Sequence, residues 1–189
     1  MITSLYPVFR RWSDGCAVWL ISDTHFMDKD CLCMDPRWPL PEDHIAMINS
    51  RVGKHDTIIH LGDVGHPSFI KRLNGDRKIL ITGNHDLGNA RYVEFFDEIY
   101  NGPLVVGQKL ILSHEPVDVP WAYNIHGHCH CRESPVEERG FNVTSDVVDF
   151  KPINLGNLIK DGALSGITNI HRMVIDDKYF TDKFAEGSE

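Results

Sequence analysis

Seven side chains with metal-binding chemistry follow five short apolar stretches of this chain. They are Asp23, His25, Asp63, Asn84, His114, His128 and His130. The set combines carboxylate and amide oxygens with imidazole nitrogens and contains no thiolate. Such a set favours a divalent ion such as Mn, Fe, Zn, Co or Ni, and it is too rich in nitrogen for Ca or Mg.

The number of candidate ligands points to two ions rather than one. Seven ligands are too many for a single ion that must keep a position open for water, whereas one bridging carboxylate lets them supply four ligands to each of two ions. Two divalent ions keep a net positive charge beside two aspartates, so a phosphate ester is the natural occupant. Two such ions lower the pKa of a bridging water and clamp phosphoryl oxygens. The residues therefore predict a phosphoester hydrolase in which a bridging hydroxide attacks phosphorus.

His85 and Asp86 are the candidate catalytic residues. Adjacent residues at a strand-to-loop turn point in different directions, so His85 need not face the same ion as Asn84. With Asp86 holding one ring nitrogen, His85 is placed to protonate a leaving alkoxide or to stabilise charge in the transition state. Asp86 is then predicted to orient His85.

The ligands are positioned by apolar runs that are typical of buried strands. The runs with their polar endings are Ala17–His25, Thr57–Asp63, Lys78–Asp86, Lys109–His114 and Tyr123–His130. In an open α/β sheet, ligands bind outside the carboxyl ends of the strands. We therefore expect the five endings to meet at one edge.

The order of the expected elements indicates the fold class. Helices are predicted from Pro41, over residues 67–73 and over residues 90–99, and they alternate with the first three strands as in a layered α/β domain. Residues 28–41 are predicted to be a long loop near the site. The second half is richer in strands. Its predicted strands cover residues 104–106, 110–112, 123–126, 141–144 and 172–175, a turn is predicted at 107–108, and a helix is expected near 154–160. Two mixed β-sheets packed face to face with helices outside accommodate both halves, in one domain over residues 1–189.

Charge and composition restrict the partners. The 19 Lys and Arg residues against 27 Asp and Glu residues give a net charge of −8. This balance argues against extended nucleic-acid binding, but a small phosphoester substrate can still reach a metal site.

No apolar run approaches the roughly 18 to 20 residues of a membrane span. Five Cys residues, an odd number without a recognisable signal peptide, favour a cytoplasmic location. The oligomeric state is not predicted.

Five motifs in a fixed order connect the chain to a known family. They are Asp23-x-His25, Gly62-Asp63, Gly83-Asn84-His85-Asp86, Ser113-His114 and Gly127-His128-x-His130. In these motifs the chain resembles the calcineurin-like metallophosphoesterase superfamily, and residues 142–155 are similar to the tail of its small bacterial and phage members. The resemblance implies a four-layer αββα sandwich and a two-metal phosphoesterase that uses Mn, Fe, Zn or Ni.

The resemblance also implies a role for each site residue. Asp23, His25 and His130 would hold one ion, Asn84, His114 and His128 would hold the other, and Asp63 would bridge the two. His85 would be the catalytic histidine, with Asp86 as its orienting partner.

One segment departs from the family pattern. The protein phosphatases and diadenosine-polyphosphate hydrolases of the family carry Asp-Arg-Gly after the second aspartate, whereas Val64-Gly65-His66 follows Asp63 here. The missing arginine removes a group that grips phosphate. A phosphodiesterase or small-molecule phosphatase therefore fits better than a protein phosphatase. The alternatives are a non-catalytic metal-containing binding module of the same fold, and a nuclease.

Other residues have simpler interpretations. Cys31, Cys33, Cys129 and Cys131 could form a structural zinc site, but the one-residue gap within each pair favours small packed residues. His60 and His126 are predicted core residues, and His44, His55 and His171 are predicted surface residues. For Arg37, Trp38, His66 and Asn142, both a place at the site and an ordinary surface or packing role are open.

Overall fold

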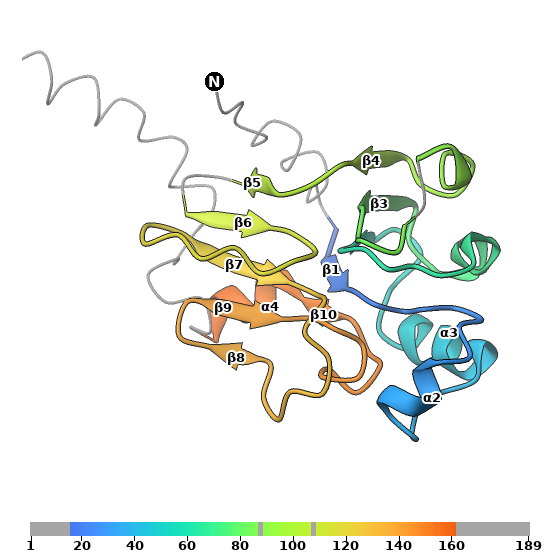
Figure 1. Cartoon of the computed structure of the whole chain (residues 1–189). Coiled ribbons are helices and arrows are strands. Elements are labelled where there is room, and N and C mark those ends of the chain that lie inside the picture. The colour runs from blue at the N-terminus through green and yellow to red at the C-terminus, as the bar shows by residue number, and fades with distance from the viewer. Residues whose placement is uncertain (1–15, 87–88, 107–108, 162–189) are drawn as a thin grey trace, which may run out of the picture.

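Two β-sheets of five strands each form the body of the protein (Figure 1). The computed structural model describes residues 16–86, 89–106 and 109–161. The predictions for the turn at residues 107–108 and for the strand at residues 172–175 lie outside the described residues, as does His171.

The first sheet has the strand order β10-β1-β2-β3-β4. Its strands are β1 (Val18–Ile21), β2 (Thr57–His60), β3 (Arg77–Ile81), β4 (Glu98–Tyr100) and β10 (Ile153–Asn154). Strands β1 to β4 are parallel, and β10 pairs antiparallel with β1 at the edge. β1 is wholly apolar, and the apolar residues of β2 and β3 are buried, as expected for parallel strands that are covered on both faces.

The second sheet has the order β5-β6-β7-β9-β8. Its strands are β5 (Leu104–Val106), β6 (Leu110–Leu112), β7 (Tyr123–His126), β8 (Val136–Glu137) and β9 (Gly140–Asn142). The central strands β6, β7 and β9 are parallel, and β5 and β8 pair antiparallel at the two edges. The prediction of two mixed sheets is therefore confirmed.

The main core lies between the sheets. Side chains alternate across a strand, so Leu20, Ile59 and Ile79 face the second sheet and meet Leu112 and Ile125 from its inner face. The opposite face of the first sheet forms a second cluster, in which Ile58 and Leu80 pack against α3 (Pro41–Asn49) and the 3-10 helix η1 (Pro67–Arg72). Figure 1 shows α3 on the side of the first sheet that faces away from the second sheet.

Most of the predicted helices are found at the expected positions, but not all of them are α-helices. α3 begins at Pro41 with Glu42 and Asp43 in its first turn, where the helix dipole favours acids. The predicted helix near residues 67–73 forms as the 3-10 helix η1. The segment predicted as a loop contains one helical turn, α2 (Cys31–Met34). The helix predicted near residues 154–160 is present as α4 (Leu155–Lys160). Within the described residues, no helix is long and apolar enough to cross a membrane.

The helix predicted over residues 90–99 is wrong. A short 3-10 turn, η2 (Asn89–Arg91), is followed by strand β4. The open edge of β3 takes up this segment, since the Asp97 amide donates to the Lys78 carbonyl at 2.8 Å and the Thr82 amide donates to the Tyr100 carbonyl at 2.9 Å. Within this segment Val93 is 63% exposed, so it does not belong to the core. Sheet pairing, a tertiary interaction, decides the conformation here.

Candidate metal centre

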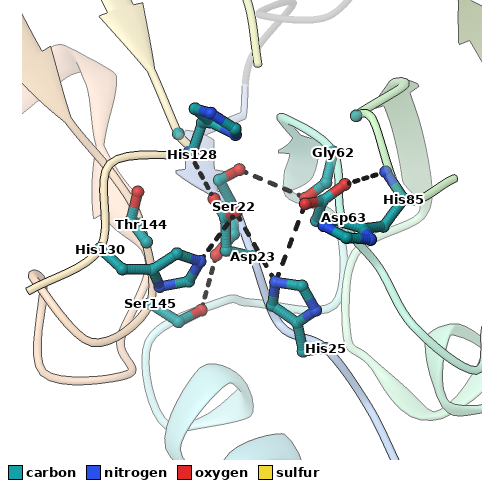
Figure 2. A network of polar contacts seen from close by, with 12 residues as sticks. Ser22, Asp23, His25, Gly62, Asp63, His85, His128, His130, Thr144 and Ser145 are labelled. Atoms are coloured by element: carbon teal, nitrogen blue, oxygen red, sulfur yellow. Dashed lines mark hydrogen bonds and ion pairs between the residues drawn. The ribbon is translucent and has the colours of Figure 1, made fainter. Parts of the chain in front are cut away.

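All seven predicted ligands lie just beyond the carboxyl ends of strands β1, β2, β3, β6 and β7. Because the parallel strands of each sheet end at the same edge, the site forms where the two edges meet. Ser22 joins them: its amide donates to the Val143 carbonyl at 3.0 Å, and its carbonyl accepts from the Ser145 hydroxyl at 2.6 Å (Figure 2). Residues that are more than 100 positions apart in sequence are thereby held side by side.

The first group of side chains consists of Asp23, His25 and His130. Their ligand atoms all lie within 4.8 Å of one another. His130 Nε2 is 3.4 Å from Asp23 Oδ1, and His25 Nε2 is 3.8 Å from the same oxygen. These are the three residues that the resemblance assigns to one ion.

The second group contains Asp63, His114 and His128, again with ligand atoms within 4.8 Å of one another. His114 Nε2 lies 3.2 Å from His128 Nδ1. Asn84 joins this group, because its Oδ1 lies 2.8 Å from His114 Nε2. The structure thus brings together the residues that the resemblance assigns to the other ion.

Asp63 stands between the two groups. Its Oδ2 lies 3.8 Å from His25 Nε2 in the first group and 3.4 Å from His114 Nε2 in the second. Its other oxygen, Oδ1, accepts a hydrogen bond from the His85 amide at 2.9 Å (Figure 2). One carboxylate oxygen is therefore fixed by the backbone, while the other faces nitrogen atoms of both groups, as a bridging ligand would.

Two unpartnered atoms indicate that this arrangement suits a cation. Asp23 Oδ1 and His25 Nε2 are buried and have no hydrogen-bond partner among the described residues. Buried polar side-chain atoms nearly always have a partner, because leaving one unpaired costs about 1–3 kcal/mol. Both atoms belong to the first group and face one another across it. A metal ion bound there would satisfy both, so the residues fit the ion that the motifs imply.

The two aspartates are held in their charged form. Burial alone would raise the pKa of Asp63, but contact with His114 and the hydrogen bond from the His85 amide lower it to about 2. The pKa of Asp23 is also lowered, because contact with His130 and the nearby charge of His114 outweigh burial. Metal ligands must be deprotonated, and both carboxylates meet this condition at neutral pH.

The histidines differ in the acids that surround them. Burial lowers the pKa of His25 more than Asp23 and Asp63 raise it. Burial would also lower the pKa of His130, but Asp146 and Asp23 outweigh it and raise the pKa to about 10. The pKa of His114 is raised against burial by Asp63 and Asp23.

Close backbone contacts fix the positions of the ligands. Asp23, His25, Asp63 and His128 have φ between 42° and 66°, a left-handed conformation that costs a non-glycine residue about 1–2 kcal/mol. At Gly127, an added Cβ would lie 2.0 Å from Ser22 Oγ and 2.5 Å from Asp23 Oδ2. At Gly83, an added Cβ would lie 2.2 Å from Asp63 Oδ1. The glycines of the motifs are therefore required for the backbone to approach the two carboxylates.

Asp146 is a site residue that the ligand motifs do not include. Its Oδ1 lies 2.9 Å from His130 Nδ1, and its Oδ2 accepts from the Cys131 amide at 2.8 Å. A carboxylate on the second nitrogen of a metal-binding histidine fixes the orientation of the ring. Asp146 lies in the stretch 142–155 noted for its resemblance, and its acidic type was the available signal.

Asp86, predicted to orient His85, contacts other groups in the structure. Its Oδ2 accepts from the amides of Asp63 and Gly83 at 2.9 and 2.8 Å. Its Oδ1 accepts from the Val64 amide at 3.0 Å and from the Tyr92 hydroxyl at 2.9 Å. These four donors occupy the carboxylate, so Asp86 holds the loops after β2 and β3 together.

The His85 ring lies at the edge of the first group. Its centroid is 5.8 Å from that of His25, and the side chain is exposed. This position is compatible with contact to a substrate, and the catalytic role of His85 stays a prediction.

Of the four residues whose role the sequence left open, some lie at the candidate site and others have a structural role elsewhere. Trp38 lies beside the first group, with its ring centroid 6.0 Å from His130 and 6.1 Å from His25. Arg37 is directed to the Asp35 carboxylate at 2.7 Å. His66 caps η1 through Ser68. Asn142 donates to the Cys129 carbonyl at 2.6 Å and therefore supports the loop that carries His130.

The remaining histidines and the cysteines behave as follows. His60 and His126 are buried, and His55 is exposed, as predicted. The prediction for His44 is wrong, because its ring is buried next to Phe26 and Phe150. The four cysteines considered for zinc do not form a common metal-binding group within the described residues. Cys31 is instead grouped with His25 and Asp28, and burial with nearby acids raises its pKa to about 12, so its thiol stays protonated.

Comparison with known proteins places the fold. No protein-family model matches the chain, and no curated protein matches it. A solved structure of a protein of unknown function from Aquifex aeolicus, AQ665, superposes with a TM-score of 0.64 at 24% identity, covering 77% of this chain and 98% of that one. This likeness shows a shared fold.

Two further solved structures match less extensively. They are the Pseudomonas putida nuclease MPE, with a TM-score of 0.43 at 21% identity over 59% of this chain and 60% of that one, and a Vps29 single mutant from Entamoeba histolytica, with a TM-score of 0.41 at 15% identity over 68% and 72%. The fold and the site together define the chain as a two-sheet α/β sandwich with a cluster of His and Asp side chains that could bind metal at one edge.

Proposed function

We propose that this protein hydrolyses phosphate esters with two divalent metal ions held on either side of Asp63. The observation that carries the proposal is the position of Asp63 Oδ2, which faces His25 at 3.8 Å and His114 at 3.4 Å. A carboxylate with two sets of imidazoles around one oxygen is suited to two ions. The unpartnered atoms of Asp23 and His25 support an ion in the first group.

The ligands divide into two sets in this proposal. Asp23, His25 and His130 would hold one ion with Asp63, and Asn84, His114 and His128 would hold the other. When bound, two such ions supply Lewis acidity to phosphoryl oxygens and lower the pKa of water between them.

The protein's own groups supply orientation and proton transfer. Asp146 fixes the His130 ring, and the His85 amide fixes Asp63. The exposed His85 imidazole donates a proton to the departing oxygen of the ester. This role agrees with its place beside His25 and outside the two groups.

The proposed substrate is a small phosphoester. The net charge of −8 opposes a long polyanion, which would need a continuous basic surface. The Asp-Arg-Gly segment of protein phosphatases is absent at Asp63. A phosphodiester or a small phosphomonoester remains.

The test combines metal content with turnover. Metal-stripped protein is reloaded with Mn, Zn or Ni, its ions are counted by elemental analysis, and hydrolysis of bis-p-nitrophenyl phosphate is compared with that of p-nitrophenyl phosphate. We expect two ions per chain and turnover of at least one ester. His85→Gln should keep both ions and lose at least about 100-fold in kcat, the usual contribution of a general acid. The exposed His55→Gln is the matched control.

The outcomes separate the alternatives. Asn84→Ala should lose one ion and most of the activity. Two bound ions without turnover of either ester would contradict hydrolysis of simple phosphoesters and favour the non-catalytic binding module. Fewer than two bound ions with every metal would contradict the two-ion site itself.

A further inference from the structure

A pocket of about 390 Å³ opens beside the second group of ligands. Its walls come from three loops, at residues 82–84, 101–103 and 113–117, and they include Asn84 and His114 themselves. The pocket therefore adjoins the position where the second ion would bind. Its volume is at the lower end of the range for small-molecule sites, which suits one or two rings.

The walls of this pocket favour an uncharged polar group. Pro103, Pro116 and Val117 provide apolar surface, and the exposed side chains of Asn101 and Glu115 provide hydrogen-bonding groups. Within the part of the chain that the structure describes, no Lys or Arg lines the pocket. Among the described lining residues, a second phosphate or a carboxylate would meet no basic side chain and would be repelled by Glu115, whereas hydroxyl groups can donate to the Glu115 carboxylate and the Asn101 amide oxygen.

The position of His85 decides which part of a substrate can occupy the pocket. His85 does not line it, and the His85 ring lies 5.8 Å from His25 on the side of the first group. An alcohol that leaves with a proton from His85 must lie near that ring. A group in the pocket lies beside Asn84 and His114, whereas neither His25 nor His85 lines the pocket. We therefore assign this group to the other ester arm.

We infer that this pocket binds the arm of a phosphodiester that remains on the phosphate after hydrolysis, and that this arm is an uncharged, hydroxyl-bearing ring group of nucleoside size. The inference rests on the proposed function for the phosphodiester, whereas binding of the ring group rests on the pocket alone. It identifies residues 101–103 and 115–117 as specificity determinants.

The first experiment measures binding without metal or turnover. Thymidine, a neutral nucleoside, is titrated into metal-stripped full-length protein and followed by saturation-transfer NMR. We expect saturable binding that Asn101→Trp weakens about tenfold, because the indole fills the pocket and the amide is lost. Asn157→Trp, on the exposed surface of α4, is the matched control and should bind as the wild type does. Absence of saturable binding to the wild type, or equal binding by both variants, overturns the inference.

The second experiment uses the metal-loaded enzyme and two diesters with the same leaving group. Thymidine 5′-(p-nitrophenyl) phosphate carries the ring arm, and methyl p-nitrophenyl phosphate lacks it. Asn101→Trp should raise KM about tenfold for the thymidine ester and leave the methyl ester unchanged. An equal change for both esters overturns the inference. Failure to hydrolyse any ester, combined with thymidine binding that Asn101→Trp weakens, contradicts the proposed function and leaves the ring-binding site in place.

Discussion

Oδ1 of Asp146 lies 2.9 Å from Nδ1 of His130, while Nε2 of the same ring is 3.4 Å from Asp23 Oδ1. The imidazole is therefore held between two carboxylates, one of which belongs to the first ligand group. Asp146 also accepts from the Cys131 amide, so it fixes both the ring and the adjacent backbone. This places Asp146 as a positioning residue for the candidate metal centre.

Removing the charge of Asp146 should weaken binding of the ion in the first group more than binding of the ion in the second group. With Asp146→Asn, we expect about 10- to 100-fold weaker binding at the site of His130, the usual effect of losing a carboxylate that orients a metal-binding histidine. Competition with a chromophoric chelator measures both affinities. The exposed neighbour Asp149→Asn is the control. Unchanged affinity in Asp146→Asn would show that the ring is oriented by other contacts.

Substitution of Asp86 should lower the free energy of unfolding of the protein. Its carboxylate accepts hydrogen bonds from three backbone amides and from the Tyr92 hydroxyl. In Asp86→Asn, the NH2 group of the new side chain would face some of these donors and could not accept from them. We expect a loss of about 2–3 kcal/mol in the free energy of unfolding, measured by urea denaturation of metal-stripped protein. The exposed Asp76→Asn should cost less than about 1 kcal/mol. Equal stability of the two variants would refute this assignment.

Gly127→Ala tests the close approach of the two sheets. The new methyl group would lie 2.0 Å from Ser22 Oγ and 2.5 Å from Asp23 Oδ2, so both side chains or the backbone that carries them must shift. We expect about 1–3 kcal/mol of destabilisation and weaker binding of the ion at Asp23. Gly156→Ala in the exposed first turn of α4 serves as the control. Wild-type metal affinity in Gly127→Ala would show that the backbone adjusts without disturbing Asp23.

Buried His44 should make the protein less stable in mild acid. Burial, with a smaller contribution from His60, lowers its pKa from 6.5 to about 3. The unfolded chain therefore binds a proton between these values while the folded protein does not. This contribution to stability is present above pH 6.5 and is lost as the pH falls toward 3, at about 1.4 kcal/mol per pH unit.

His44→Leu isolates this effect. The leucine cannot be protonated, so the difference in unfolding free energy between pH 7.5 and pH 5 should be smaller than in the wild type by about 1–2 kcal/mol. Urea denaturation at the two pH values measures it, with the exposed His55→Leu as the control. His60, whose pKa is lowered by burial to about 4, keeps part of the pH dependence in both variants. An identical pH dependence in His44→Leu and the wild type would contradict the assignment.

Local patterns were sufficient for the five strands that carry the candidate ligands. Apolar runs such as those of β2 and β7 are short, continuous and bounded by turn residues, so their type and limits follow from the sequence. Because parallel strands of one sheet share one edge, the convergence of Asp23 and Asp63 beyond β1 and β2 could also be expected. Packing of the second sheet then brings His114 to 3.4 Å from Asp63.

Tertiary contacts decided the rest. Residues 98–100 became a strand because the open edge of β3 offered hydrogen bonds that no local pattern reveals. Asp86 binds backbone amides of the β2 loop, 22 and 23 residues away, although in sequence it is the neighbour of His85. His44 is buried by aromatic rings from two distant segments, Phe26 and Phe150. The sequence by itself determined which residues could hold metal and which strands would carry them. Only the tertiary structure decided which groups each carboxylate contacts. These contacts depend on side-chain directions and on segments that lie far apart in the chain.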